Sequence, residues 1–260
     1  MKPIDTPDDQ GLDAPASARQ PAIGGAQRGT LIGIGIGPGD PDLITLKALK
    51  VLNAAPVLAY PAPDTGASLA RAIVAPHLDG HHTEICIRMP MVTARFPAQE
   101  VYDWAAEEIA VHLDAGRDVV CLCEGDPFVY GSFSFLFARL VDRYPVEVVP
   151  GVSSITACAA VLGAPLATRN DVFSIVPGTL DMAALEAQLE RVDAAAIIKV
   201  GRHLAKIRAV LTKLELMTNA RYIERATMPA QNSMPLAEFV AESAPYFSMI
   251  LVHKRGLAWN

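Results

Sequence analysis

The amino-acid sequence predicts an α/β protein built from two α/β domains with a cleft between them. Short apolar runs rich in β-branched residues alternate along the chain with segments whose apolar residues recur at helical spacing. This alternation favours a mainly parallel sheet. Three loops rich in glycine and proline each follow a predicted strand. Because open α/β sheets bind ligands beyond the carboxyl ends of their strands, these loops are the first candidates for a site.

The first domain is expected over residues 29–126. Predicted strands cover 30–37, 57–60, 83–88 and 118–123, and predicted helices lie between them, the last over 97–115. Asp40 is a candidate cap for the first helix, and Pro41 suits a first helical position. The order βαβαβαβ predicts parallel strands. Residues 1–28 are rich in Pro, Asp, Ala, Gln and Gly without periodicity, which is typical of a disordered tail.

The second domain is expected over residues 127–260, with the loop at 125–130 as a hinge. Helices are predicted at 131–141, 155–162, 182–191 and 204–214, and strands at 146–149, 173–176, 195–200, 221–225 and 249–253. The late strands are close enough in sequence for antiparallel pairing, so this sheet is expected to be mixed. A cleft between two such halves is a natural ligand site.

The composition excludes several classes of protein. The 260 residues carry a formal net charge of −6, which argues against binding nucleic acid by broad phosphate neutralisation. Hydrophobic residues make up 51% of the chain, yet no apolar run is long enough to span a bilayer. The amino terminus lacks a basic region followed by an apolar stretch, so we expect a cytoplasmic protein with no membrane partner.

Cysteine and histidine spacing predicts no metal site. The four cysteines fall inside predicted strands and helices and form neither a disulfide framework nor a zinc spacing. The pair His81-His82 admits a metal interpretation, but a histidine pair in a surface loop is favoured.

The first glycine loop does not fit the Rossmann fingerprint. Gly33-x-Gly35-x-x is followed by Pro38 where glycine or alanine is required, and no convincing acidic residue ends the second strand. No Gly-Lys-Ser/Thr phosphate loop occurs either.

The other two loops contain polar side chains with two possible roles each. Asp126, between Gly125 and Pro127, either accepts hydrogen bonds from a ligand or forms a local Asx turn. Ser153 and Ser154 stand where a helix begins, so one can bind ligand while the other caps.

Taken together, the three loops resemble those of the tetrapyrrole methylases, the S-adenosylmethionine-dependent enzymes of corrin and sirohaem synthesis. The matching segments are 35–41 (GIGPGDP), 124–131 (EGDPFVYG) and 149–154 (VPGVSS), and the resemblance covers about residues 29–255. It implies two α/β domains, usually in a homodimer, with S-adenosylmethionine in the cleft. Matched to the family's cofactor contacts are Pro38, Gly125, Asp126, Val129, Ser153 and Ser154, and more loosely Val200 and Ala226.

Within the family, the segments 43–50 and 59–61 resemble the branch that methylates a meso carbon of the macrocycle early in cobalamin synthesis. Pro61 stands where the uroporphyrinogen-methylating branch has an Asp, so that residue's proposed acid–base role does not transfer. Alternatives are the same reaction on the cobalt-bound substrate, sibling methylases of other ring carbons, and the related methylases of diphthamide and ribosomal RNA. The negative charge disfavours RNA. A different class is a nucleotide-binding module without methyltransferase activity.

Methyl transfer from a sulfonium is a direct displacement, so the protein has mainly to align the reactants. A proton then leaves the meso carbon, and Tyr60, Asp40 and Tyr130 are candidate acceptors by location alone. The implied tetrapyrrole carries many carboxylates, which favours cationic side chains near strand ends. The candidates are Arg88, Arg95, Arg169, Lys199, Arg202 and His203.

Overall fold

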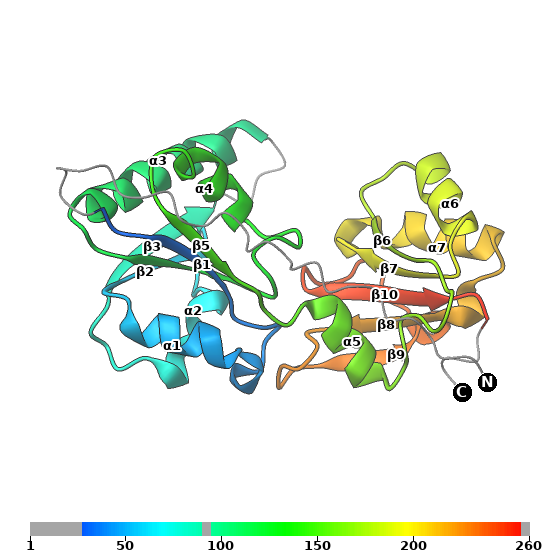
Figure 1. Ribbon diagram of the computed structural model, residues 1–260. Coiled ribbons are helices and arrows are strands. Elements are labelled where there is room, and N and C mark those ends of the chain that lie inside the picture. The colour runs from blue at the N-terminus through cyan, green and yellow to red at the C-terminus, as the bar shows by residue number, and fades with distance from the viewer. Residues whose placement is uncertain (1–27, 90–94, 256–260) are drawn as a thin grey trace, which may run out of the picture.

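A computed structural model of the chain describes residues 28–89 and 95–255. Two five-stranded sheets, each covered by helices, form two lobes (Figure 1). The expected pair of α/β domains is thus confirmed. The expected disordered tail lies outside the described residues, except for Arg28.

The first sheet is entirely parallel, in the order β3-β2-β4-β1-β5. Its strands are β1 (Leu31–Gly35), β2 (Val57–Pro63), β3 (Thr83–Met89), β4 (Val119–Cys123) and β5 (Val146–Val149). The helices of this lobe are α1 (Leu46–Ala54), α2 (Leu69–Val74), α3 (Arg95–Asp114) and α4 (Phe133–Leu140).

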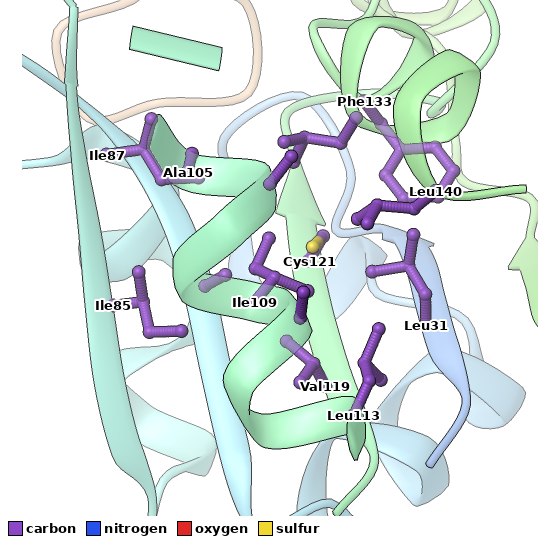
Figure 2. Packing of buried hydrophobic residues seen from close by; sticks show 14 of the residues in the cluster. Leu31, Ile85, Ile87, Ala105, Ile109, Leu113, Val119, Cys121, Phe133 and Leu140 are labelled. Carbon is purple, nitrogen blue, oxygen red and sulfur yellow. The ribbon is translucent and has the colours of Figure 1, made fainter. Parts of the chain in front are cut away.

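Helices cover both faces of this sheet. One buried cluster joins α3 and α4 to the sheet, and a second joins α1 and α2 to the opposite face. Figure 2 shows Ile109 and Leu113 of α3 against Val119 and Cys121 of β4. Burial raises the pKa of the Cys121 thiol to about 12, so this cysteine is a protonated core residue.

The beginning of the first helix differs from the prediction. Asp40 caps only a 3-10 turn, η1 (Pro41–Leu43), where its Oδ1 accepts from the amide of Asp42 at 2.9 Å. Thr45 is the cap of α1, because its Oγ1 accepts from the amide of Ala48 at 3.2 Å. A separate 3-10 turn therefore precedes α1, and the helix begins at Leu46 and not directly after Asp40.

The second sheet is mixed, as expected, in the order β6-β7-β10-β8-β9. β6 (Phe173–Pro177) and β7 (Ala194–Ile198) are parallel, while β10 (Ser248–His253) runs antiparallel to β7 and to β8 (Ala220–Glu224). The edge strand β9 (Asn232–Pro235) was not predicted, because its four residues carry no period-2 apolar pattern. Against one face pack α6 (Met182–Glu190) and α7 (Leu204–Lys213), and against the other packs α5 (Ser154–Leu162).

The expected domain boundary at 126/127 does not coincide with the division between the sheets. β5 pairs with β1, and α4 contributes Phe133, Leu136 and Leu140 to the core of the first lobe. The first sheet therefore ends at Val149. The glycine loop at 125–130 marks a strand-to-helix connection inside the lobe, which local sequence does not distinguish from a hinge.

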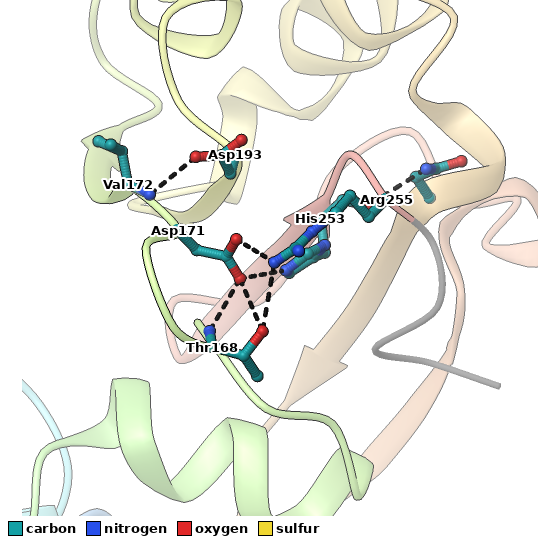
Figure 3. A network of polar contacts seen from close by, with 7 residues as sticks. Thr168, Asp171, Val172, Asp193, His253 and Arg255 are labelled. Carbon is teal, nitrogen blue, oxygen red and sulfur yellow. Dashed lines mark hydrogen bonds and ion pairs between the residues drawn. The ribbon is translucent and has the colours of Figure 1, made fainter.

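A polar network closes the second lobe on the side away from the first (Figure 3). The side chain of Asp171 is only 6% exposed and pairs with His253 and Arg255. Its Oδ2 also accepts from the amide of Thr168 at 2.8 Å. This amide bond and the side-chain hydrogen bonds from Arg255, Thr168 and His253 hold the pKa of Asp171 down at about 2. The network joins the chain before β6 to the end of β10.

Asp171→Asn is expected to lower the melting temperature at pH 7, and the difference from wild type should vanish in acid. Because the folded-state pKa is depressed, the carboxylate stabilises the fold above its ordinary pKa of 3.8. This contribution is lost as the pH falls through about 2. Thermal unfolding of wild type and Asp171→Asn, followed from pH 7 down to about 2, measures this contribution. A difference in melting temperature that persists at the acid end would contradict the prediction.

Candidate active site where three loops meet

The three glycine loops converge at the carboxyl end of the first sheet. Gly35, Gly125 and Gly151 touch backbone to backbone: a Cβ on Gly35 would lie 2.5 Å from the Gly125 oxygen and 2.5 Å from the Gly151 Cα. A Cβ on Gly151 would lie 2.1 Å from the same oxygen. Gly125 also has φ +71°, which favours glycine. Only residues without side chains let these three loops meet.

Hydrogen bonds fasten the loops to one another. The Gly125 amide donates to the Gly37 carbonyl at 2.8 Å. Asp126 Oδ2 accepts from the amide of Gly151 at 3.0 Å, and its Oδ1 accepts from the amide of Phe128 at 2.9 Å. Asp126 thus forms the local turn that the sequence offered as one interpretation. In addition it ties the second loop to the third, which no local pattern predicts.

The two serines have separate roles. Ser153 caps α5, with its Oγ accepting from the amide of Ile155 at 3.3 Å. Ser154 is exposed, and its hydroxyl makes no hydrogen bond within the described part of the chain. Ser154 is therefore the serine whose hydroxyl is open to a ligand.

The second lobe reaches the same loops. The Asp40 amide donates to Thr227 Oγ1 at 3.1 Å, and Lys199 Nζ lies 5.3 Å from the centre of the Tyr130 ring. Val200 follows Lys199, and Ala226 precedes Thr227, and both are buried. The structure thus brings the loosely matched residues next to the first and second loops.

Backbone strain concentrates at this junction. Tyr130, Lys199, Arg225 and Thr227 have φ values of +57°, +56°, +47° and +68°, in the region that L residues rarely occupy. Such conformations persist only where surrounding contacts enforce them, and they cluster at functional sites.

The candidate proton acceptors lie in different environments. The Tyr60 hydroxyl donates to Glu84 Oε2 at 2.7 Å, and burial, followed by this bond, raises the pKa of Tyr60 to about 12. Asp40 is used as the cap of η1. Tyr130, in contrast, is 54% exposed beside Lys199.

Glu124 is a residue that the sequence reasoning missed. It directly follows β4 and precedes Gly125, and burial raises the pKa of its carboxyl. No ion pair joins it to a described residue. One signal in the sequence could have identified Glu124, namely a carboxyl directly after a central strand. Its burial could not be predicted, because a Glu-Gly-Asp-Pro segment is typical of an exposed turn.

The candidate cationic residues do not form one cluster. Arg88 Nη1 donates to the Pro63 carbonyl at 3.0 Å and so supports the loop after β2. Lys199 and Arg202 are exposed after β7, and Lys199 lies beside Tyr130 at the junction. Arg169 is exposed in the loop before β6. His203 ends η3 (Gly201–His203), where burial lowers its pKa. Arg95 begins α3, but its side chain lies outside the described set.

The two α/β lobes with a three-loop junction at the carboxyl ends of the first sheet's strands have the arrangement of an enzyme with its site between two domains. Residues 30–239 match the model of the family Tetrapyrrole (Corrin/Porphyrin) Methylases, and the chain belongs to this family. No helix in the described ranges is both long and apolar enough to cross a membrane.

Comparison with individual proteins shows which members of the family the chain is similar to. The chain is 42% identical over 238 residues to a precorrin-2 C(20)-methyltransferase of Sinorhizobium sp., covering 88% of this chain and 97% of the relative. It is 32% identical to a cobalt-precorrin-2 C(20)-methyltransferase of Salmonella typhimurium, covering 87% and 97%. A crystal structure of uroporphyrin-III C-methyl transferase from Thermus thermophilus, complexed with S-adenyl homocysteine, is similar with a TM-score of 0.64 and 26% identity, covering 88% of this chain and 100% of that one.

Proposed function

We propose that this protein transfers a methyl group from S-adenosylmethionine to the C-20 meso carbon of precorrin-2, giving precorrin-3A in cobalamin biosynthesis. The observation that carries the proposal is the meeting of the three loops, in a chain 42% identical over nearly its whole length to a precorrin-2 C(20)-methyltransferase. The cobalt-bound substrate is the second candidate, supported by the more distant Salmonella relative.

The residues at the junction suit S-adenosylmethionine. The missing side chains at Gly35 and Gly151 let the three loops pack together, so their amides and carbonyls gather at one place, and Ser154 offers an open hydroxyl. When bound, S-adenosylmethionine supplies a methyl group already activated by its sulfonium. We assign the cofactor contacts to Pro38, Gly125, Asp126, Val129, Ser153, Ser154, Val200 and Ala226, with Ser153 acting through its backbone.

The chain's own contribution is alignment of the reacting groups. Interlocked loops and enforced backbone conformations fix the binding residues before the ligands arrive, and such positioning supplies roughly 7–11 kcal/mol of a barrier. Lys199, exposed beside Tyr130 at the junction, is the cation best placed for substrate carboxylates, and Arg202, exposed in the following turn η3, is the second candidate.

Tyr60→Phe is expected to retain most of the methyltransferase activity and to leave its pH profile unchanged. A hydroxyl with a pKa of about 12 that already donates to Glu84 does not accept a proton near neutral pH. Initial rates across pH 6–9, with Tyr130→Phe in parallel, check this. A large loss of rate in Tyr60→Phe, together with the loss of one arm of the pH–rate profile, would instead show that Tyr60 is the acid–base group.

The decisive experiment measures label transfer from methyl-labelled S-adenosylmethionine into enzymatically made precorrin-2. We expect one labelled methyl per macrocycle, and a faster reaction on the metal-free than on the cobalt-bound substrate. The reverse preference would assign the cobalt reaction, while an inert mixture would contradict both. Calorimetry with S-adenosylmethionine, NAD(P) and ATP separates a methyltransferase from a general nucleotide-binding module.

We further propose that the protein acts in the cytoplasm as a homodimer, in keeping with the family resemblance. Light scattering after size-exclusion chromatography measures the oligomeric state. A monomer at micromolar concentration would contradict this part of the proposal and leave the reaction untouched.

A further inference from the structure

Three side chains that can ligate a metal ion lie close together at the end of the first sheet opposite to the three-loop junction. Asp79, His81 and His82 sit in the connection before β3, at the amino end of the strand, whereas the three loops gather at the carboxyl ends. One potential ligand atom from each of the three side chains lies within 4.8 Å of the other two. The two imidazole rings are close as well, with centroids 3.8 Å apart.

The main chain fixes the orientation of both histidines. His81 Nε2 lies 3.2 Å from the Ala55 carbonyl oxygen, and His82 Nε2 lies 2.8 Å from that of Leu52. A carbonyl oxygen only accepts hydrogen bonds, so each Nε2 carries the proton and each neutral ring has its lone pair on Nδ1. Histidines that bind metal almost always donate their other ring N–H in this way.

The remaining ring nitrogens need a partner. His82 Nδ1 is buried and has no hydrogen-bond partner among the described residues. His81 Nδ1 faces the Asp79 carboxylate in very close contact. Two groups that both accept hydrogen bonds lie at hydrogen-bond distance only if a cation is shared between them. A proton or a metal ion can fill that role, but a proton on His81 leaves His82 Nδ1 unsatisfied.

We propose that Asp79, His81 and His82 bind one divalent transition-metal ion of the zinc type. Two imidazoles and one carboxylate suit Zn²⁺, with water completing the tetrahedron. Water has access, since the side chains of His81 and Asp79 are 40% and 70% exposed. The carbonyls of Leu52 and Ala55 belong to the end of α1, so the ion fastens the α1–β2 connection to the one before β3. Its role is structural, and the inference is independent of the methyltransferase reaction.

Zinc titration of the metal-free, untagged full-length protein against a chromophoric chelator tests the site. We expect one Zn²⁺ per chain, and an affinity at least about 10-fold weaker in Asp79→Asn and in His81→Gln, a loss seen even for the hydrogen-bond partners of metal ligands. His77→Gln is the matched control, because His77 bonds the Pro41 carbonyl outside the cluster. Circular dichroism verifies that each variant is folded.

Two further measurements distinguish binding at this cluster from binding through other side chains. Zn²⁺ should raise the melting temperature of the wild type and of His77→Gln, and not of the cluster variants. Bound Co²⁺ should show ligand-field bands without thiolate charge transfer, which would instead implicate the partly exposed Cys86. Absence of saturable binding would mean that a proton alone joins His81 to Asp79. Either that result or binding unaffected by the variants would overturn the proposal.

Discussion

Gly151→Ala is expected to reduce the affinity for S-adenosylmethionine by roughly 100-fold, equivalent to about 3 kcal/mol. The added methyl group would lie 2.1 Å from the Gly125 oxygen and 2.6 Å from the Gly35 Cα, both of them backbone atoms. The loops therefore have to separate. Loss of one or two hydrogen bonds to a charged ligand, at about 1.5–3 kcal/mol each, would account for an effect of this size. Overpacking also costs about 1–3 kcal/mol of stability.

Calorimetry at 25 °C measures the affinity, and Gly163→Ala is the control. Gly163 ends α5 at φ +62° with open space around it, so its substitution strains the backbone without a collision. The control is expected to lose about 1–2 kcal/mol of stability with unchanged affinity. Equal affinities for Gly151→Ala and wild type would mean that the three-loop contact does not form the cofactor site.

Asp126→Ala is expected to weaken cofactor binding by roughly 10-fold while the protein remains folded. The substitution leaves the amides of Gly151 and Phe128 without their acceptor, and a hydrogen bond to a charged group contributes about 1.5–3 kcal/mol. Because both amides can turn to water at this partly exposed position, we expect the lower end of that range.

Asp126→Asn separates the two functions of this side chain. The amide oxygen can keep the turn bond to Phe128, but the amide nitrogen would then face the Gly151 N–H, donor against donor. Affinity close to that of Asp126→Ala would assign the effect to the tie between loops. Wild-type affinity in both variants, measured by the same calorimetry, would reduce Asp126 to a turn residue.

Local signals were enough to predict much of the fold. Glycine, proline and aspartate mark turns within a few residues, so the three loops and the strands before them could be located from sequence. The pairing of β5 with β1 was not predictable, since a strand of four residues contains no information about which sheet edge it joins. For that reason the first sheet extends to Val149, beyond the boundary expected at 126/127.

The site was predictable as a set of loops but not as a set of contacts. The partners of Asp126 and Asp40, namely the Gly151 amide and the Thr227 hydroxyl, lie 25 and 187 residues away in sequence. The first pair depends on the joining of β5 to the first sheet, and the second pair depends on how the two lobes pack. Neither is encoded in a local periodicity. The burial of Glu124 and the carbonyls that orient His81 and His82 likewise depend on the folded arrangement and not on a local pattern.

The place of β10 has a consequence for biosynthesis. This strand, the last of the ten that the described residues form, fills the middle of its sheet between β7 and β8. During translation the first lobe has all five of its strands once Val149 has emerged, whereas the second keeps a gap in its centre until Ser248–His253 leaves the ribosome. The nascent second lobe exposes two unpaired strand edges over that interval, and a chain that stops short of β10 should be a substrate for chaperones and proteases rather than a shortened enzyme.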